Sequence, residues 1–249
     1  MKSTLVANWK MNPATFREAK LLFETTKKAA DKAKNVQVIV AAPAIFLRQL
    51  AVGYRGRIAF ALQNGFPEAR GAHTGEISFA QGADSRASYA IIGHAERRAM
   101  GESNEQTKAK VAGALKQELT PILCVGEEKR DGSGQHFPFI REQLRAGLAD
   151  VPASSIKKVL IAYEPVWVIG ATKPMSPRDM HEMSIFIRKT IVEFYGEGGM
   201  ESKILYGGSV DEISAPEMLR DGDVRGLLVG RASAETHHIT KLLAAIESA

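Results

Sequence analysis

Residues 159–162, Val-Leu-Ile-Ala, form a short apolar run that is followed at once by Tyr163, Glu164 and Pro165. The run has no alternation of polar and apolar side chains, which is typical of a strand buried on both faces of a parallel sheet. A charged residue directly after such a strand is a candidate functional group, because binding and catalytic residues gather where parallel strands end.

Runs of the same kind recur along the chain, each separated from the next by a longer helical stretch. Together with Val159–Ala162 they predict strands at Thr4–Ala7, Val36–Ala41, Ile58–Leu62, Ala90–Ile92, Pro121–Val125, Ile204–Tyr206 and Gly226–Val229. Eight strands alternating with helices in 249 residues favour an α/β fold, a closed (β/α)8 TIM barrel in a single domain spanning residues 1–249. The alternation alone leaves an open doubly wound sheet as the alternative.

The stretches between the strands carry the signals of helix starts. Apolar residues repeat at three- and four-residue spacing from Ala19 to Ala33, and we expect this helix to begin at Asn12-Pro13, since Pro suits the first helical turn. Ser103 stands three residues before Gln106, the spacing of a capping box, and Ser176-Pro177 predicts another helix start.

The composition points to an intracellular globular protein. Cys124 is the single cysteine, which excludes a disulfide framework and favours a reducing cytoplasm. We expect neither a secretory signal nor a membrane span at the start of the chain. The formal net charge is +5, which we interpret as a solvated basic surface that would also attract an anionic substrate. No basic stretch is interleaved with aromatics, so nucleic acid is not an expected partner.

Polar and small residues follow several of the predicted strands. Taken singly, a His after a strand, a Glu before a Pro or a lone Lys is more often structural than catalytic. In a barrel, however, all of these positions face one mouth. They predict a base, an acid and a cation beside a glycine-lined anion site. The candidates are Asn8, Lys10, His94, Glu96, Glu164, Ser209, Gly230 and Arg231.

These strand ends resemble the triosephosphate isomerase family in order and over nearly the whole chain. The matching segments are Ala7–Asn12, Gly75–Ser78, Ile92–Arg98, Ile122–Glu127, Ala162–Trp167 and Tyr206–Val210. The resemblance implies a cofactor- and metal-free interconversion of dihydroxyacetone phosphate and glyceraldehyde 3-phosphate, a step of glycolysis and gluconeogenesis.

The resemblance also implies a role for each residue. Glu164 would move a proton between the two carbons, and His94, as a neutral imidazole, would move one between the two oxygens. Lys10 and Asn8 would stabilise the enediolate charge. Glu96 would either orient Lys10 or form a structural ion pair with an Arg, and both alternatives stay open.

By the same resemblance, the substrate phosphate would rest on backbone N–H groups near Gly170, Ser209 and Gly230. Residues 165–176 would form a lid that closes over the substrate and excludes water. Cys124 has no activating partner in the sequence, so we interpret it as a buried packing residue.

The sequence departs from the family's pattern at four positions. Ala95 lacks the Ser hydroxyl that would hold the resting glutamate, so Glu164 is expected to wait elsewhere. Thr172 and Pro174 predict a stiffer far hinge of the lid. Arg231 replaces a glycine, which would cost about 1 kcal/mol if the backbone were left-handed. We expect its side chain to point outward, with a charge near the phosphate as the alternative.

The segment Asn64–Ser78, with Thr74 near its tip, resembles the loop through which the family forms homodimers. Two other functions are open at this point. One is isomerisation of a four-carbon ketose phosphate in a slightly larger pocket. The other is a non-catalytic barrel that binds sugar phosphate or a protein, which would be expected to lose Lys10, His94 or Glu164.

Overall fold

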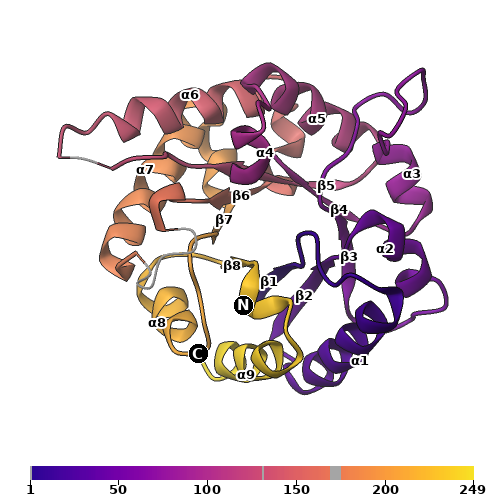
Figure 1. The fold of residues 1–249 in the computed structure, drawn as a ribbon. Helices are drawn as coiled ribbons and strands as arrows, with labels where there is room; N and C mark the ends of the chain where they lie inside the picture. Colours follow the sequence, from indigo (N-terminus) through magenta and orange to yellow (C-terminus); the bar gives the residue numbers. More distant parts are fainter. Residues whose placement is uncertain (1, 131, 169–174) are drawn as a thin grey trace.

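A computed structural model of the chain describes residues 2–130, 132–168 and 175–249. Its eight parallel strands pair in chain order, and β8 pairs with β1 to close a barrel (Figure 1). The strands are β1 (Ser3–Asn8), β2 (Val36–Ala41), β3 (Ala59–Leu62), β4 (Tyr89–Ile92), β5 (Thr120–Val125), β6 (Leu160–Tyr163), β7 (Lys203–Tyr206) and β8 (Gly226–Val229). The predicted barrel is therefore confirmed, and the open sheet is excluded.

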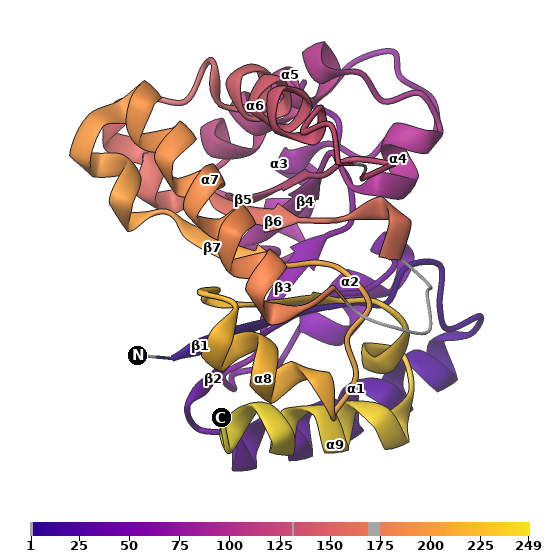
Figure 2. The ribbon, with the colours of Figure 1, turned by 90° about the vertical axis from the view of Figure 1, so that its left-hand side faces the viewer.

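The helices form a ring outside the strands (Figures 1 and 2). They are α1 (Phe16–Lys32), α2 (Ala44–Ala51), α3 (Phe79–Asp84), α4 (Ala95–Ala99), α5 (Asn104–Lys116), α6 (His136–Leu148), α7 (Pro177–Tyr195), α8 (Ser214–Asp221) and α9 (Thr236–Glu247). Short 3₁₀ turns complete the connections: η1 (Ala153–Lys158), η2 (Val166–Val168), η3 (Gly196–Glu201) and η4 (Arg231–Ser233). No described helix is long and apolar enough to cross a membrane.

Two of the predicted helix starts are confirmed and one is wrong. Ser103 caps α5 with Gln106 in a capping box, and Ser176 caps α7. The first helix does not begin at Asn12-Pro13. It begins at Phe16, because Thr15 and Glu18 form a reciprocal capping box there. The Asn12–Pro13 peptide, which is cis, lies in the preceding loop.

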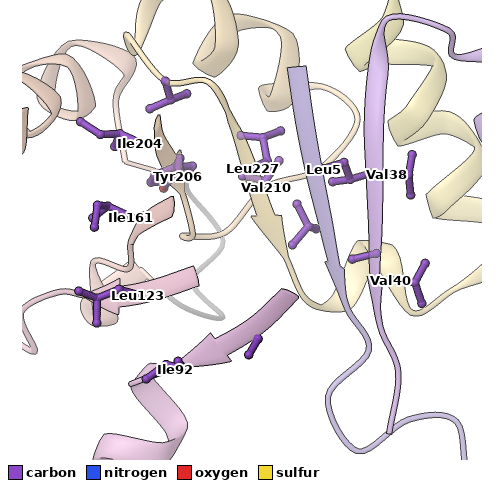
Figure 3. Close-up of a cluster of buried hydrophobic side chains, with 14 of the residues drawn as sticks. Leu5, Val38, Val40, Ile92, Leu123, Ile161, Ile204, Tyr206, Val210 and Leu227 are labelled. Atoms are coloured by element: carbon purple, nitrogen blue, oxygen red, sulfur yellow. The ribbon is translucent and has the colours of Figure 1, made fainter. Parts of the chain in front are cut away.

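The buried side chains divide into two layers by the two-residue period of the strands. Along β1, Leu5 and Ala7 belong to a large cluster shared with the helices, whereas Val6 belongs to a smaller one. Part of the large cluster, including Leu5 and Leu123, is drawn in Figure 3; this cluster lies outside the barrel, between strands and helices. The smaller cluster is made of strand residues and fills the barrel interior. This packing leaves the loops at the carboxyl ends of the strands free to carry polar groups.

Candidate active site

A cavity of about 770 Å³ opens at the carboxyl ends of the strands. It brings together seven of the predicted site residues from five strand ends: Asn8, Lys10, His94, Glu164, Ser209, Gly230 and Arg231. Glu96 does not line the cavity but contacts Lys10. Gly170 lies outside the described residues, as do Thr172, Pro174 and most of the predicted lid.

The Glu164 carboxylate is buried, with 2 % of the residue exposed. Its Oε2 accepts a hydrogen bond from the backbone N–H of Ala95 at 2.8 Å, and its Oε1 lies 3.1 Å from His94 Nε2. Gly207 allows this position, because a Cβ there would lie 2.8 Å from Glu164 Cγ. The carboxylate is thus held between two donors that both come from the end of β4.

Ala95 contacts Glu164 through its backbone, because its side chain has no hydroxyl. Glu164 rests against residue 95 although that residue has no hydroxyl. The Ala95 N–H, near the start of α4, supplies the hydrogen bond instead. A backbone donor at a helix start suits a carboxylate, because the free N–H groups there carry partial positive charge.

The hydrogen bonds of His94 identify its protonated nitrogen. The Glu96 N–H donates to His94 Nδ1 at 3.2 Å, so Nδ1 carries no proton. The proton of the neutral ring then sits on Nε2, which faces Glu164. The N–H comes from the first turn of α4, whose N-cap residue is His94. His94 is therefore set up as a neutral donor that points into the cavity.

Lys10 lies opposite, on the loop after β1. Its ammonium is 2.5 Å from Glu96 Oε1, which favours the orienting role of Glu96 over pairing with an Arg. The neighbouring Arg97 pairs with Glu102 instead. The Lys10 backbone has a φ of 53°, a left-handed conformation that is uncommon for a side-chain-bearing residue. Such local strain is typical of functional sites.

Asn8 and Gln63 fix that loop. Asn8 is 5 % exposed and its Oδ1 accepts from the Lys10 N–H at 3.0 Å. Gln63, which follows β3, donates through Nε2 to the carbonyls of Lys10 and Ala41 at 2.8 and 2.7 Å. Sequence reasoning missed Gln63. Its position directly after a predicted strand was the available signal.

The segments after β7 and β8 contribute Gly208, Ser209, Gly230 and Arg231 to the cavity wall. A Cβ on Gly230 would lie 2.9 Å from Lys10 Cε, so the glycine lets the lysine stem pack closely. Arg231 is exposed and is not among the described residues with positive φ. The strain considered for a non-glycine residue at this position is therefore absent.

A second carboxylate, which sequence reasoning left without a role, lies behind the site. Glu127, 2 % exposed, accepts from Tyr163 Oη at 2.8 Å and from Trp167 Nε1 at 2.9 Å. Burial, with the charge of Glu127 beside it, raises the pKa of Tyr163 far above its ordinary value. The pair anchors the first residues after Glu164 to the end of β5.

Glu102 forms a similar buried anchor for the loop after β3. It accepts from the Gly93 N–H at 3.0 Å and pairs with Lys110 at 2.5 Å, and Lys110 in turn donates to Asn64 at 2.8 Å. No motif in the sequence singles out Glu102. Only the tertiary structure joins these groups, which come from three different segments.

Cys124 is fully buried in the barrel interior, as predicted. Burial raises the pKa of its thiol well above the ordinary range, so the reactive thiolate is disfavoured. In the described ranges, no group of three or more His, Cys, Asp and Glu side chains is placed to hold a metal ion.

The arrangement suits proton transfer beside a carbonyl. A buried carboxylate is a base, a neutral imidazole N–H is a donor for an oxygen, and an ammonium stabilises developing negative charge. Two comparisons agree with this chemistry. The family model described as "Triosephosphate isomerase" matches residues 3–246. A triosephosphate isomerase from Endomicrobium trichonymphae is 39% identical over 245 residues, which cover 97% of this chain and 98% of that protein.

Proposed function

Because the chain belongs to the triosephosphate isomerase family, we propose that it interconverts dihydroxyacetone phosphate and D-glyceraldehyde 3-phosphate through an enediolate intermediate. This is an aldose–ketose isomerisation of glycolysis and gluconeogenesis, and it needs no cofactor. The observation that carries the proposal is the buried Glu164 carboxylate 3.1 Å from His94 Nε2, in one cavity with Lys10.

Glu164 takes the proton from the carbon beside the substrate carbonyl and returns it to the neighbouring carbon. An aliphatic C–H is a weak acid, so the reaction depends on stabilising the enediolate as it forms. Lys10 supplies a positive charge for it, held in place by Glu96 and by the Asn8 side chain. His94 donates its Nε2 proton to one oxygen and recovers a proton from the other.

The phosphate end of the substrate rests on the small residues Ser209 and Gly230, with Gly170 of the lid, and with Arg231 beside them. Small residues allow backbone N–H groups to approach the phosphate closely. Binding the dianion away from the reacting carbons supplies energy that positions the substrate. Trp167 Nε1 donates to Glu127, and this contact supports a fixed first hinge for a lid of residues 165–176.

We also propose a homodimer formed through Asn64–Ser78, in a reducing cytoplasm, with residues 1–249 as one domain. Met11, Ile45 and Met100 are exposed apolar residues, at 92%, 75% and 75%. They lie in the segments after β1, β2 and β4; β1 and β2 are adjacent in the barrel, and β3 separates β2 from β4. A second copy of the chain that covers this side would remove them from water. The single cysteine, which is free and buried, supports a reducing cytoplasm as the compartment.

The test is to assay the purified chain with glyceraldehyde 3-phosphate, alongside Glu164→Asp and Glu164→Gln. The Asp variant withdraws the carboxylate by one methylene, so kcat should fall by about 10²-fold. The Gln variant removes the base, and kcat should fall by about 10⁴-fold at nearly unchanged KM. A parent chain that turns over a four-carbon ketose phosphate faster than the triose would overturn the proposed substrate. Full activity in Glu164→Gln would overturn the base.

A further inference from the structure

The charges that line the active-site cavity are unevenly paired. Lys10 is paired with Glu96 at 2.5 Å, and His238 lies 3.5 Å from Glu212 and 3.7 Å from Glu235. Arg231 also lines the cavity, but its guanidinium has neither an ion pair nor a hydrogen bond within the part of the chain that the structure describes. Among the described residues that line the cavity, Arg231 is thus an exposed cation with no carboxylate paired to it.

The backbone of Arg231 is held firmly although its side chain is exposed. Arg231 opens the η4 turn, and the following Ala232 and Ser233 are buried. Ser233 Oγ donates to the Val229 and Gly230 carbonyls, at 2.6 and 2.8 Å. The turn is therefore fixed to the end of β8, so the guanidinium starts from a defined point at the cavity wall.

That point lies beside small residues of the cavity wall. Gly230 precedes Arg231 and packs against the Lys10 stem, and Ser209 lines the same cavity. Four carboxylates line the cavity as well and would repel an anion: Glu18, Glu164, Asp211 and Glu235. Asp211 is engaged by the Ser214 backbone N–H and hydroxyl, and Glu235 lies near His238. A cation with free donors offsets that repulsion.

We propose that the Arg231 guanidinium binds the phosphodianion of the substrate directly, as a specificity-determining residue of this chain. The planar guanidinium presents paired N–H donors that match two phosphate oxygens, and such charge-assisted bonds are stronger than neutral ones. The inference rests on the proposed function, because it assigns a residue to that substrate's phosphate. It takes up the alternative that the sequence left open, a charge near the phosphate, in place of the outward orientation.

Arg231 also gives the mouth a charge that attracts the substrate before contact. A cation at the rim of a cleft raises the association rate of an anion, and this contribution falls as salt screens it. The salt dependence of kcat/KM is therefore a signature of Arg231 that a merely structural residue would not produce.

The experiment compares the parent with Arg231→Gln, Arg231→Lys and Arg225→Gln. Arg225 is the matched control, because it is also exposed and precedes β8 at the opposite end of the barrel. Three quantities are measured: KM for glyceraldehyde 3-phosphate, the inhibition constant of inorganic phosphate, and the slope of log kcat/KM against log salt.

Arg231→Gln should raise KM and the phosphate inhibition constant by about tenfold each, with kcat changed by less than about threefold and a shallower salt slope. Arg231→Lys should recover the salt slope but only part of the affinity, because an ammonium lacks the paired donors. Arg225→Gln should match the parent in all three.

The inference is overturned if Arg231→Gln and Arg225→Gln both match the parent. It is also overturned if Arg231→Gln lowers kcat while the inhibition constant of phosphate stays the same. If the parent proves inactive on trioses, calorimetric titration of the parent and Arg231→Gln with inorganic phosphate still decides the point. Equal affinities then reject the role of Arg231, and a tenfold loss supports it although the proposed reaction has failed.

Discussion

Single residues of the site acquire their roles from partners distant in the sequence. The Glu164 carboxylate meets the Ala95 N–H and His94 Nε2, and both come from the end of a different strand. His94 in turn is oriented by a backbone N–H of its own helix start. Each contact constrains one atom, so together they fix the position of the base and the tautomer of the acid.

Ala95→Ser tests how tightly the resting base is held. A Ser hydroxyl next to the existing N–H would give the buried carboxylate a further donor, and this bond has to be released before Glu164 accepts a proton from carbon. We expect kcat to fall by about three- to tenfold. The control is Ala99→Ser, which places the same hydroxyl on an exposed position of α4. Steady-state kinetics that leave kcat unchanged in Ala95→Ser would contradict this account.

At the scale of the elements, strand ends and helix starts are tied by buried polar side chains. Tyr206, the last residue of β7, is buried and its hydroxyl accepts from the Met175 N–H at 3.1 Å. Met175 directly precedes the Ser176 cap of α7. This contact fixes the point at which the chain enters α7.

The stability of the protein should fall at alkaline pH because of this tyrosine. Burial raises the pKa of Tyr206 to about 12. The unfolded chain releases that proton near pH 10 and the folded chain keeps it, so stability is lost as pH rises from 10 to 12. The loss should be about 2–3 kcal/mol in the free energy of unfolding, measured by urea denaturation.

Tyr206→Phe provides the control for the alkaline effect. The variant lacks both the titrating hydroxyl and the bond to Met175, so it starts less stable at neutral pH. Between pH 10 and 12 its stability should fall less steeply than that of the parent. A part of the slope remains, because burial also raises the pKa of Tyr163. Parallel curves for parent and variant would refute the assignment.

At the scale of the whole molecule, barrel closure places the loops after the strands, and the exposed apolar residues that some of them carry, at one end. The exposed side chains of Met11, Ile45 and Met100 follow β1, β2 and β4, which are close in the barrel order. Asn64, at the start of the proposed docking loop, is bound to Lys110 and through it to Glu102. The loop that would meet a second copy is thus anchored at its base.

Ile45→Lys tests the proposed dimer by placing a charge in the apolar surface. The parent should sediment as two chains, and the variant should dissociate to the 27.1 kDa chain at low micromolar concentration, because a buried unpaired ammonium is costly. The matched control is Leu21→Lys, an exposed apolar residue of α1 at 63% exposure. A parent that sediments as a single chain at every concentration would reject the dimer.

The sequence by itself determined the strand order, the closed barrel and the set of residues at the strand ends. Buried parallel strands have short apolar sequences, and in a barrel all of their carboxyl ends lie at the same end. Thus Glu164 and His94 were predicted to converge although 70 residues separate them in the numbering. The start of α1 was misplaced at Asn12-Pro13, since the capping box of Thr15 and Glu18 gave the stronger helix start.

Only the tertiary structure decided which atoms meet. It joined Lys10 to Glu96, gave the Ala95 N–H to Glu164, and brought Gln63 under the Lys10 loop. It also placed Arg231 at the cavity without a left-handed backbone. The physical reason is that a local pattern fixes which end of a strand a residue occupies, whereas hydrogen-bond distances between strands depend on closure and packing of the whole barrel.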